Sequence, residues 1–225
     1  MITEEKLMKE WSDKRSNFIQ DGIVCPTKYY NNKIKVLYIL KEVNGKKGKW
    51  DFLSFLRNGG HWKTWNNIVR WQYGFENIDG YENNNYNDIE KVYNHKRKNY
   101  LQKVAIINLK KEPGGSSSNM KEIEQYCEED KELIQKQIEL YEPNIIIGCG
   151  VGYLIKSKNL LKNLSEWKVT SNNVKYAINN NNLIVIRYYH PQVRKSKKDL
   201  YNNLMITYKE IKNCKKENQS DNNCF

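Results

Sequence analysis

Three short apolar runs that end in polar residues constrain the fold of this chain more than any other feature. They lie at 36–40, 104–107 and 183–186. Each run is rich in β-branched residues and too short for a helix, which predicts three buried parallel strands. Ligands of open α/β sheets bind beyond the carboxyl ends of the strands. We therefore expect Glu42, Asn108 and His190, which follow the three runs, to surround one crevice.

The rest of the chain alternates helices with further strands. A fourth strand is predicted at 144–147, and residues 167–170 and 174–177 indicate a hairpin or edge pair. Helices are predicted at 3–20, 51–57, 64–73, 119–141, 151–157 and 198–213. This pattern predicts a three-layer α/β/α sandwich with a central, mostly parallel sheet, built by a single domain over 1–213. Residues 214–225 are polar, and we expect them to form a disordered tail.

Four short motifs follow the four predicted parallel strands in order. They are Lys-Glu-Val-Asn-Gly at 41–45, Ile-Asn-Leu-Lys-Lys at 107–111, Gly-Cys-Gly-Val-Gly at 148–152 and His-Pro-Gln at 190–192. In order and spacing the set resembles the motifs of the uracil-DNA glycosylase superfamily, and it is closest to the branch with Gly-Glu-Ala-Pro-Gly after its first strand. The resemblance covers roughly residues 33–212. It implies a uracil-DNA glycosylase-like fold and a monofunctional hydrolase that flips out uracil, or a related deaminated base, and cleaves its N-glycosidic bond.

The resemblance implies catalytic roles for Glu42, Asn44 and His190. His190 is expected to donate an N–H to uracil O2, and either Glu42 or Asn44 to hold the attacking water. Asn108 is expected to bind the base, because a carboxamide offers an acceptor for N3–H and a donor for O4. The chain departs from the family where Lys41 replaces the first Gly and Asn44 the Pro. The alternatives are that Asn108 caps a turn, that His190 is merely packed or exposed, and that Glu42 pairs with a lysine.

An aromatic ring and a small residue are expected beside the flipped base. Trp62 is the first candidate for stacking on the base and Trp65 the second, with burial in the core as the alternative for both. Gly45 stands near the place where some members of the superfamily use a tyrosine to exclude thymine, so it is included among the substrate-binding residues.

Two loops are expected to contact the DNA backbone. Ser116 and Ser117 lie in a Gly- and Ser-rich segment before a predicted helix, where hydroxyl and backbone N–H groups suit a phosphate. The alternative for this segment is a flexible loop. Arg194 follows the His-Pro pair, at the place where the family inserts a wedge into the duplex.

The charge of the chain predicts an anionic partner. Lys and Arg number 38 against 26 Asp and Glu, which gives a formal net charge of +12 at pH 7. An AT-rich genome also enriches lysine and is the alternative explanation. The basic residues cluster after the predicted strand ends, at 41–49, 110–111 and 194–198, as phosphate contacts require. We expect a monomer whose partner is DNA, either uracil-containing or single-stranded.

The cysteines predict no cofactor. The chain has five Cys and no C-x-x-C pair, so we expect neither the iron–sulfur cluster that some members of the superfamily carry nor a zinc site. Reduced thiols fit a cytoplasmic location. The first 20 residues are charged, and the longest apolar runs fall far short of the ~18–20 residues that span a bilayer, so we expect no signal peptide and no membrane contact.

Two other functions compete with base excision. Because the first motif departs from the family pattern, the second hypothesis is a catalytically inactive member of the same fold that binds DNA. The third hypothesis is an α/β enzyme that acts on a free nucleotide, and the basic residues near the crevice favour the first two. A dinucleotide-binding motif at Gly148–Gly152 fails on spacing, because the position of its third glycine holds Tyr153.

Overall fold

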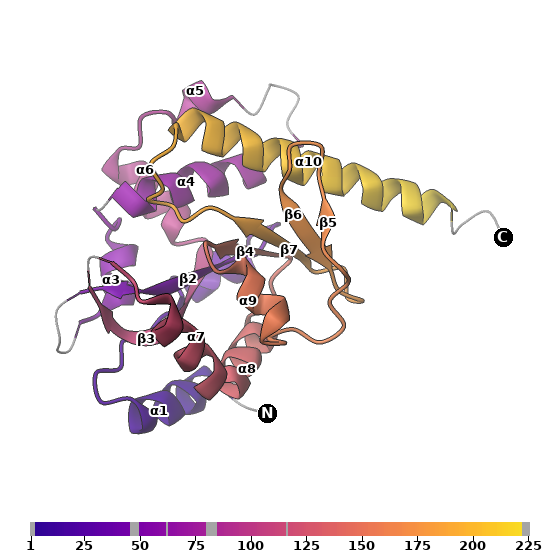
Figure 1. Cartoon of the computed structure of the whole chain (residues 1–225). Coiled ribbons are helices and arrows are strands. Elements are labelled where there is room, and N and C mark those ends of the chain that lie inside the picture. The colour runs from indigo at the N-terminus through magenta and orange to yellow at the C-terminus, as the bar shows by residue number, and fades with distance from the viewer. Residues whose placement is uncertain (1–2, 46–49, 62, 80–84, 116, 222–225) are drawn as a thin grey trace.

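A central sheet covered by helices forms the body of the protein. The computed structural model describes residues 3–45, 50–61, 63–79, 85–115 and 117–221, with side chains as far as residue 215 (Figure 1). The strands are β1 (Gly22–Ile23), β2 (Val36–Asn44), β3 (Val104–Gly114), β4 (Ile145–Cys149), β5 (Lys168–Val169), β6 (Lys175–Ile178) and β7 (Ile184–Tyr188). The helices are α1 (Glu4–Lys14), α2 (Pro26–Tyr30), α3 (Phe52–Arg57), α4 (Lys63–Glu76), α5 (Tyr86–Ile89), α6 (Asn94–Leu101), α7 (Met120–Glu129), α8 (Lys131–Tyr141), α9 (Gly152–Ser157) and α10 (Lys197–Asp221).

The sheet of the described residues has the strand order β1-β3-β2-β4-β7-β6-β5. Its central strands β3, β2, β4 and β7 are parallel, whereas β1 at one edge and β6 and β5 at the other pair antiparallel. The α/β class, the parallel centre and the edge hairpin are therefore confirmed. The chain passes from β2 to β3 on one side and later to β4 on the other. Such a reversal of strand order marks the usual ligand site of an open sheet.

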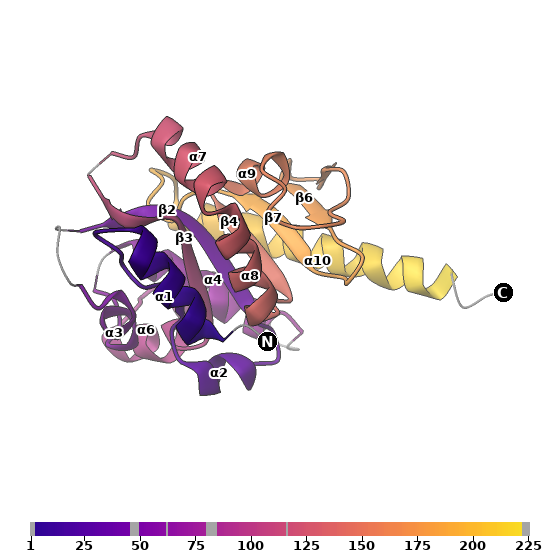
Figure 2. The same cartoon turned by 90° about the horizontal axis from the view of Figure 1, so that it is seen from below.

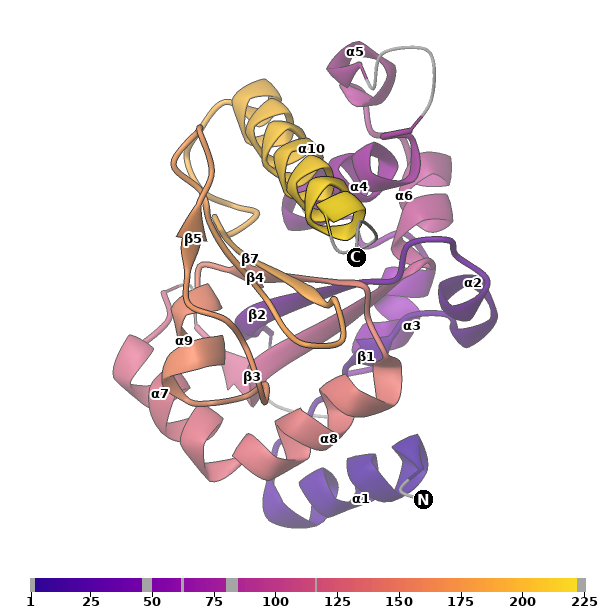
Figure 3. The ribbon, with the colours of Figure 1, turned by 90° about the vertical axis from the view of Figure 1, so that its right-hand side faces the viewer.

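Helices cover both faces of the sheet, as Figures 2 and 3 show from two directions. On one face α1, α7, α8 and α9 pack against side chains such as Leu37, Ile107 and Val185. On the other face α3, α4, α6 and α10 pack against side chains such as Tyr38 and Ile106. Successive strand residues point to opposite faces, so the continuous apolar runs of the sequence supply both cores.

The predicted long helix at 119–141 is two helices that meet at Asp130. The buried Asp130 carboxylate pairs with Lys14 Nζ at 2.7 Å and with Arg15 Nη2 at 2.9 Å. The apolar stripe continues on both sides of this break, which is why the sequence showed one uninterrupted period. The predicted first helix also ends early, at Lys14, and the segment after it extends toward the edge strand β1. Asn119 caps α7 as predicted, accepting from the Lys121 backbone N–H.

The last helix continues past its predicted end at residue 213. α10 extends to Asp221, so residues 214–221 are helical rather than disordered (Figure 1). This segment contains no Gly or Pro, and four of its eight residues are Lys, Glu or Gln, which are good helix formers. Within the described ranges, no helix combines the length and the apolar character needed to cross a bilayer.

Candidate functional site

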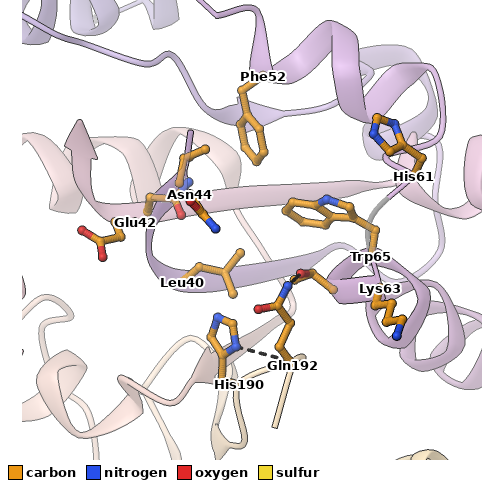
Figure 4. A pocket seen from close by; sticks show the side chains of 12 residues that line it. Leu40, Glu42, Asn44, Phe52, His61, Lys63, Trp65, His190 and Gln192 are labelled. Atoms are coloured by element: carbon orange, nitrogen blue, oxygen red, sulfur yellow. Dashed lines mark hydrogen bonds between the residues drawn. The ribbon is translucent and has the colours of Figure 1, made fainter. Parts of the chain in front are cut away.

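A cavity of about 560 Å³ lies beside the carboxyl-terminal half of β2 and the middle of β3, and beyond the carboxyl end of β7 (Figure 4). Its lining residues are Leu40, Glu42, Val43, Asn44, Phe52, His61, Lys63, Thr64, Trp65, Asn108, His190 and Gln192. The volume is within the range of small-molecule sites in proteins. Five side chains with predicted site roles, Glu42, Asn44, Trp65, Asn108 and His190, therefore line the same cavity.

The carboxyl-terminal half of β2 forms one wall of the cavity. It supplies Leu40 and the three consecutive residues Glu42, Val43 and Asn44. Parallel pairing places Asn108 beside Leu40 and Lys110 beside Glu42. The register shifts after Glu42, and such irregularities re-aim side chains near functional sites. β2 extends through Asn44, beyond the end of the apolar run at residue 40, so Glu42 and Asn44 belong to the sheet rather than to a loop.

His190 is held as a neutral imidazole beside the cavity. The backbone N–H of Gln192 donates to His190 Nδ1 at 3.2 Å, which assigns the ring proton to Nε2. Burial, with a smaller effect from the Lys41 ammonium, lowers the pKa of His190 from 6.5 to about 4. The turn is anchored on α4, because Asn67 Nδ2 donates to the Pro191 carbonyl at 2.6 Å. In Figure 4 the other ring nitrogen points into the cavity, where it offers an N–H donor at neutral pH.

Asn108 is fixed by a buried carboxylate that the sequence analysis did not consider. Its backbone N–H and its Nδ2 both donate to Asp21 Oδ2, at 2.7 and 3.1 Å. Asp21 immediately precedes β1, whose antiparallel pairing with β3 brings it to this point. The side-chain oxygen of Asn108 and the second hydrogen of Nδ2 remain for the cavity. The predicted alternative of a turn cap does not describe Asn108, which lies within β3.

Glu42 is part of a buried network of charges. Lys110 Nζ lies 3.2 Å from a Glu42 carboxylate oxygen and 2.7 Å from one of Glu122. Burial opposes the charged form of Lys110, but the hydrogen bonds that Lys110 donates to Glu122 and Glu42 raise its pKa overall. A Cβ at Gly114 would overlap the Glu42 carboxyl group, so a larger residue there would displace that group. Glu42 thus both lines the cavity and pairs with a lysine, the arrangement predicted as its alternative.

Asn44 and two aromatic rings complete the wall. Asn44 is exposed, and its side chain has no hydrogen bond with other residues of the described ranges. In Figure 4 its amide points toward the cavity, whereas the Glu42 carboxylate points away from the aromatic rings. Phe52 and Trp65 stand with ring centroids 5.6 Å apart. Trp65 is almost fully buried yet lines the cavity, so it serves both the core and the site.

Of the other predicted contact residues, those that the structure describes do not line the cavity. Trp62 and Ser116 lie outside the described residues. Gly45 packs beside Trp50, whose ring a Cβ at Gly45 would approach to 3.3 Å. Ser117 and Arg194 are exposed on the loops after β3 and β7 and are not among the lining residues.

The prediction that Lys110 and Lys111 belong to a basic rim is wrong. Both side chains are buried, Lys110 between two glutamates and Lys111 in an ion pair with Asp21. Consecutive residues of a strand point to opposite sides, which separates the two lysines into two networks. The basic side chains at 194–198 are exposed, and those at 46–49 lie outside the described residues. Lys63, which the sequence analysis overlooked, is an exposed cation that lines the cavity.

The glycines at 148–152 have a packing role. A Cβ at Gly148 would overlap Gly152, and a Cβ at Gly152 would lie 2.9 Å from Arg187 Cα. They therefore allow α9 to approach β4 and β7 closely. Gly150, with a φ of +74°, lies beside His190. In the described part of the chain, no group of three or more His, Cys, Asp or Glu is arranged to hold a metal ion.

Comparisons with known proteins identify no family for this chain. No protein-family model matches it, and no curated protein shows significant similarity to it.

Proposed function

We propose that this protein is a DNA glycosylase-like enzyme that excises uracil or a related deaminated base. The observation that carries the proposal is the pair formed by His190 and Asn108 in one cavity. His190 supplies a neutral N–H donor, and Asn108 supplies an adjacent acceptor and donor in a fixed orientation. This set fits the edge of uracil, which offers N3–H and two carbonyl oxygens.

The two residues act on different parts of the base. Asn108 accepts from N3–H and donates to O4, and this selects the base that enters the cavity. As the bond between N1 and the sugar breaks, its electron pair moves to the base and negative charge grows on O2. His190 then donates from Nε2 to O2, where a preorganised donor stabilises charge that appears only in the transition state. A neutral donor avoids the cost of holding an imidazolium next to Lys41 in a buried site.

Asn44 and Glu42 act on the sugar side. The Asn44 amide has no other partner among the described residues and points to the cavity, so we assign to it the positioning of the attacking water. Glu42 supplies negative charge that favours the developing sugar cation, and Lys110 holds that carboxylate in place. Water adds to the sugar carbon, and the proton that it loses balances the one that the uracil anion takes up.

Cleavage of a uracil-containing oligonucleotide, followed by alkali to reveal abasic sites, tests the proposal. We expect wild type to release uracil and His190→Ala to be at least a hundredfold slower in single turnover, with DNA affinity little changed. His95→Ala is the matched control, because His95 is exposed and lies outside the cavity. Equal rates for wild type and His190→Ala would refute the mechanism.

The ion pair of Glu42 favours a second candidate function, DNA binding without hydrolysis. The Glu42 carboxylate is 4% exposed and is paired with Lys110, so it has a structural role in addition to the proposed catalytic one. In this case wild type binds uracil-containing DNA and releases no base. Glu42→Gln separates the two candidates, because a catalytic Glu42 predicts loss of rate with retained affinity and a purely structural one predicts loss of stability.

A further inference from the structure

Asp21 holds the Asn108 amide from behind the cavity. Oδ2 of Asp21 accepts from both Asn108 N and Nδ2, while Oδ1 accepts from Lys111 Nζ and from Gln137 Nε2 at 3.3 Å. All four contacts come from nitrogen donors, which suits a carboxylate that can only accept. Asp21 and Lys111 are fully buried, so their charges balance each other inside the protein.

We propose that Asp21 is a positioning residue that keeps the Asn108 amide in one orientation and thereby determines which bases the cavity accepts. The inference rests on the proposed function, because it assumes that a base enters the cavity. One hydrogen of Asn108 Nδ2 is used by Asp21. The other hydrogen and Oδ1 lie on the opposite edge of the amide, which is the edge that a base can meet.

A half-turn of the Asn108 amide would reverse the pattern shown to the base. It would place Oδ1 against the Asp21 carboxylate, where two acceptors meet without a proton in a buried site. The observed orientation of the Asn108 amide pairs with a base edge that has an N–H next to a carbonyl, as in uracil and hypoxanthine. The reversed orientation pairs with a bare nitrogen next to an amino group, as in cytosine and adenine. Asp21 therefore selects deaminated bases over their parent bases.

The ion pair with Lys111 offsets the free-energy cost of burying the Asp21 carboxylate. A lone carboxylate in this position would be strongly disfavoured, and Lys111 compensates its charge while also lying over the Trp11 ring at 4.4 Å. Gln137 on α8 adds a further donor to Asp21 Oδ1. The orientation of Asn108 is thus secured by β1, β3 and α8 rather than by residues of the cavity wall.

The first test is nuclear magnetic resonance of the wild-type side-chain amides. The two proton signals of the Asn108 side-chain amide are identified by their absence from the spectrum of Asn108→Leu. We expect two separate proton signals, one shifted downfield and exchanging with solvent at least tenfold more slowly than the signals of exposed asparagines. Exchange as fast as that of exposed asparagines would overturn the inference, and this result needs no Asp21 variant to fold.

The second test compares single-turnover cleavage of uracil and cytosine in the same oligonucleotide. We expect the preference for uracil to fall at least tenfold in Asp21→Asn, because an asparagine there can donate to a reversed Asn108. Asp130→Asn is the matched control, since Asp130 is also buried and paired with basic residues but lies at the junction of α7 and α8. Equal slowing of both bases in Asp21→Asn would indicate a purely structural role and overturn the inference.

Failure of the proposed function leaves the inference testable. If wild type cleaves neither base, equilibrium affinity for oligonucleotides carrying uracil or cytosine at one unpaired position replaces the rate. A preference for uracil in wild type that Asp21→Asn reduces would support the inference. Equal affinity of wild type for the two oligonucleotides would overturn it.

Discussion

Protonation of His190 is expected to destabilise the folded protein at mildly acidic pH. Burial and the neighbouring Lys41 lower the pKa of the folded-state imidazole from 6.5 to about 4. Between these two values the unfolded chain takes up a proton at His190 that the folded protein does not. Folding is therefore disfavoured as the pH falls through 6.5, and the loss levels off once the pH is below about 4.

The size of this loss follows from the two pKa values. One pKa unit corresponds to about 1.4 kcal/mol, so His190 reduces the free energy of unfolding by about 2 kcal/mol at pH 5 and about 3 kcal/mol at pH 4, relative to pH 7. A change of this size is a large part of the stability of a small protein, which is typically about 5–15 kcal/mol.

Urea unfolding of wild type and His190→Gln at pH 7 and pH 5 measures the effect. Glutamine does not titrate, so the drop in unfolding free energy between the two pH values should be about 2 kcal/mol smaller in the variant. Carboxylates titrate in both proteins and cancel in the comparison. His95→Gln, at an exposed position, is the control and should keep the full drop. An equal drop in wild type and His190→Gln would refute the reasoning.

Three further outcomes are expected. Log affinity for DNA should fall linearly with log salt concentration, and Arg194→Gln, measured by the same titration, should lower the slope by about one if the exposed Arg194 contacts a phosphate. Gly114→Ala should displace the Glu42 carboxylate and cost about 1–3 kcal/mol in urea unfolding, whereas Gly115→Ala, where a Cβ meets only the Ser117 carbonyl at 3.9 Å, should cost little. Elemental analysis of the purified protein should find no stoichiometric iron or zinc, since the chain has no C-x-x-C pair.

The sequence predicts the sheet and the cavity for a simple physical reason. Apolar runs such as the one before Glu42 can be recognised as buried strands in the sequence. Parallel strands have their carboxyl ends at the same edge of the sheet, whatever the strand order. Glu42, Asn108 and His190 therefore come together without any knowledge of the topology. The helix break at Asp130 could not be predicted, because the helical spacing of apolar residues continues from α7 into α8.

The supports of the site could not be predicted. Asp21 is 87 residues from Asn108 in the sequence and reaches it through β1, a strand of two residues that shows no periodic pattern. Lys110 and Lys111 look like surface cations because their partners come from other elements. Only the folded arrangement places Glu42 and Asp21 on opposite sides of β3. There Glu42 pairs with Lys110, and Asp21 pairs with Lys111.

In the proposed function, these ion pairs separate the charge that attracts DNA from the chemistry of the cavity. Asp21 is compensated by Lys111, Glu42 shares Lys110 with Glu122, and His190 is neutral, so the groups behind the base carry little net positive charge. Lys63 lines the cavity, but the exposed basic residues at 194–198 lie outside it, on a surface where salt screens their charge within about 10 Å. Added salt should therefore weaken DNA affinity while leaving the single-turnover rate at saturating DNA nearly constant. Single-turnover cleavage over a salt series measures this, and a saturated rate that falls as steeply as the affinity would show that surface cations take part in the chemical step.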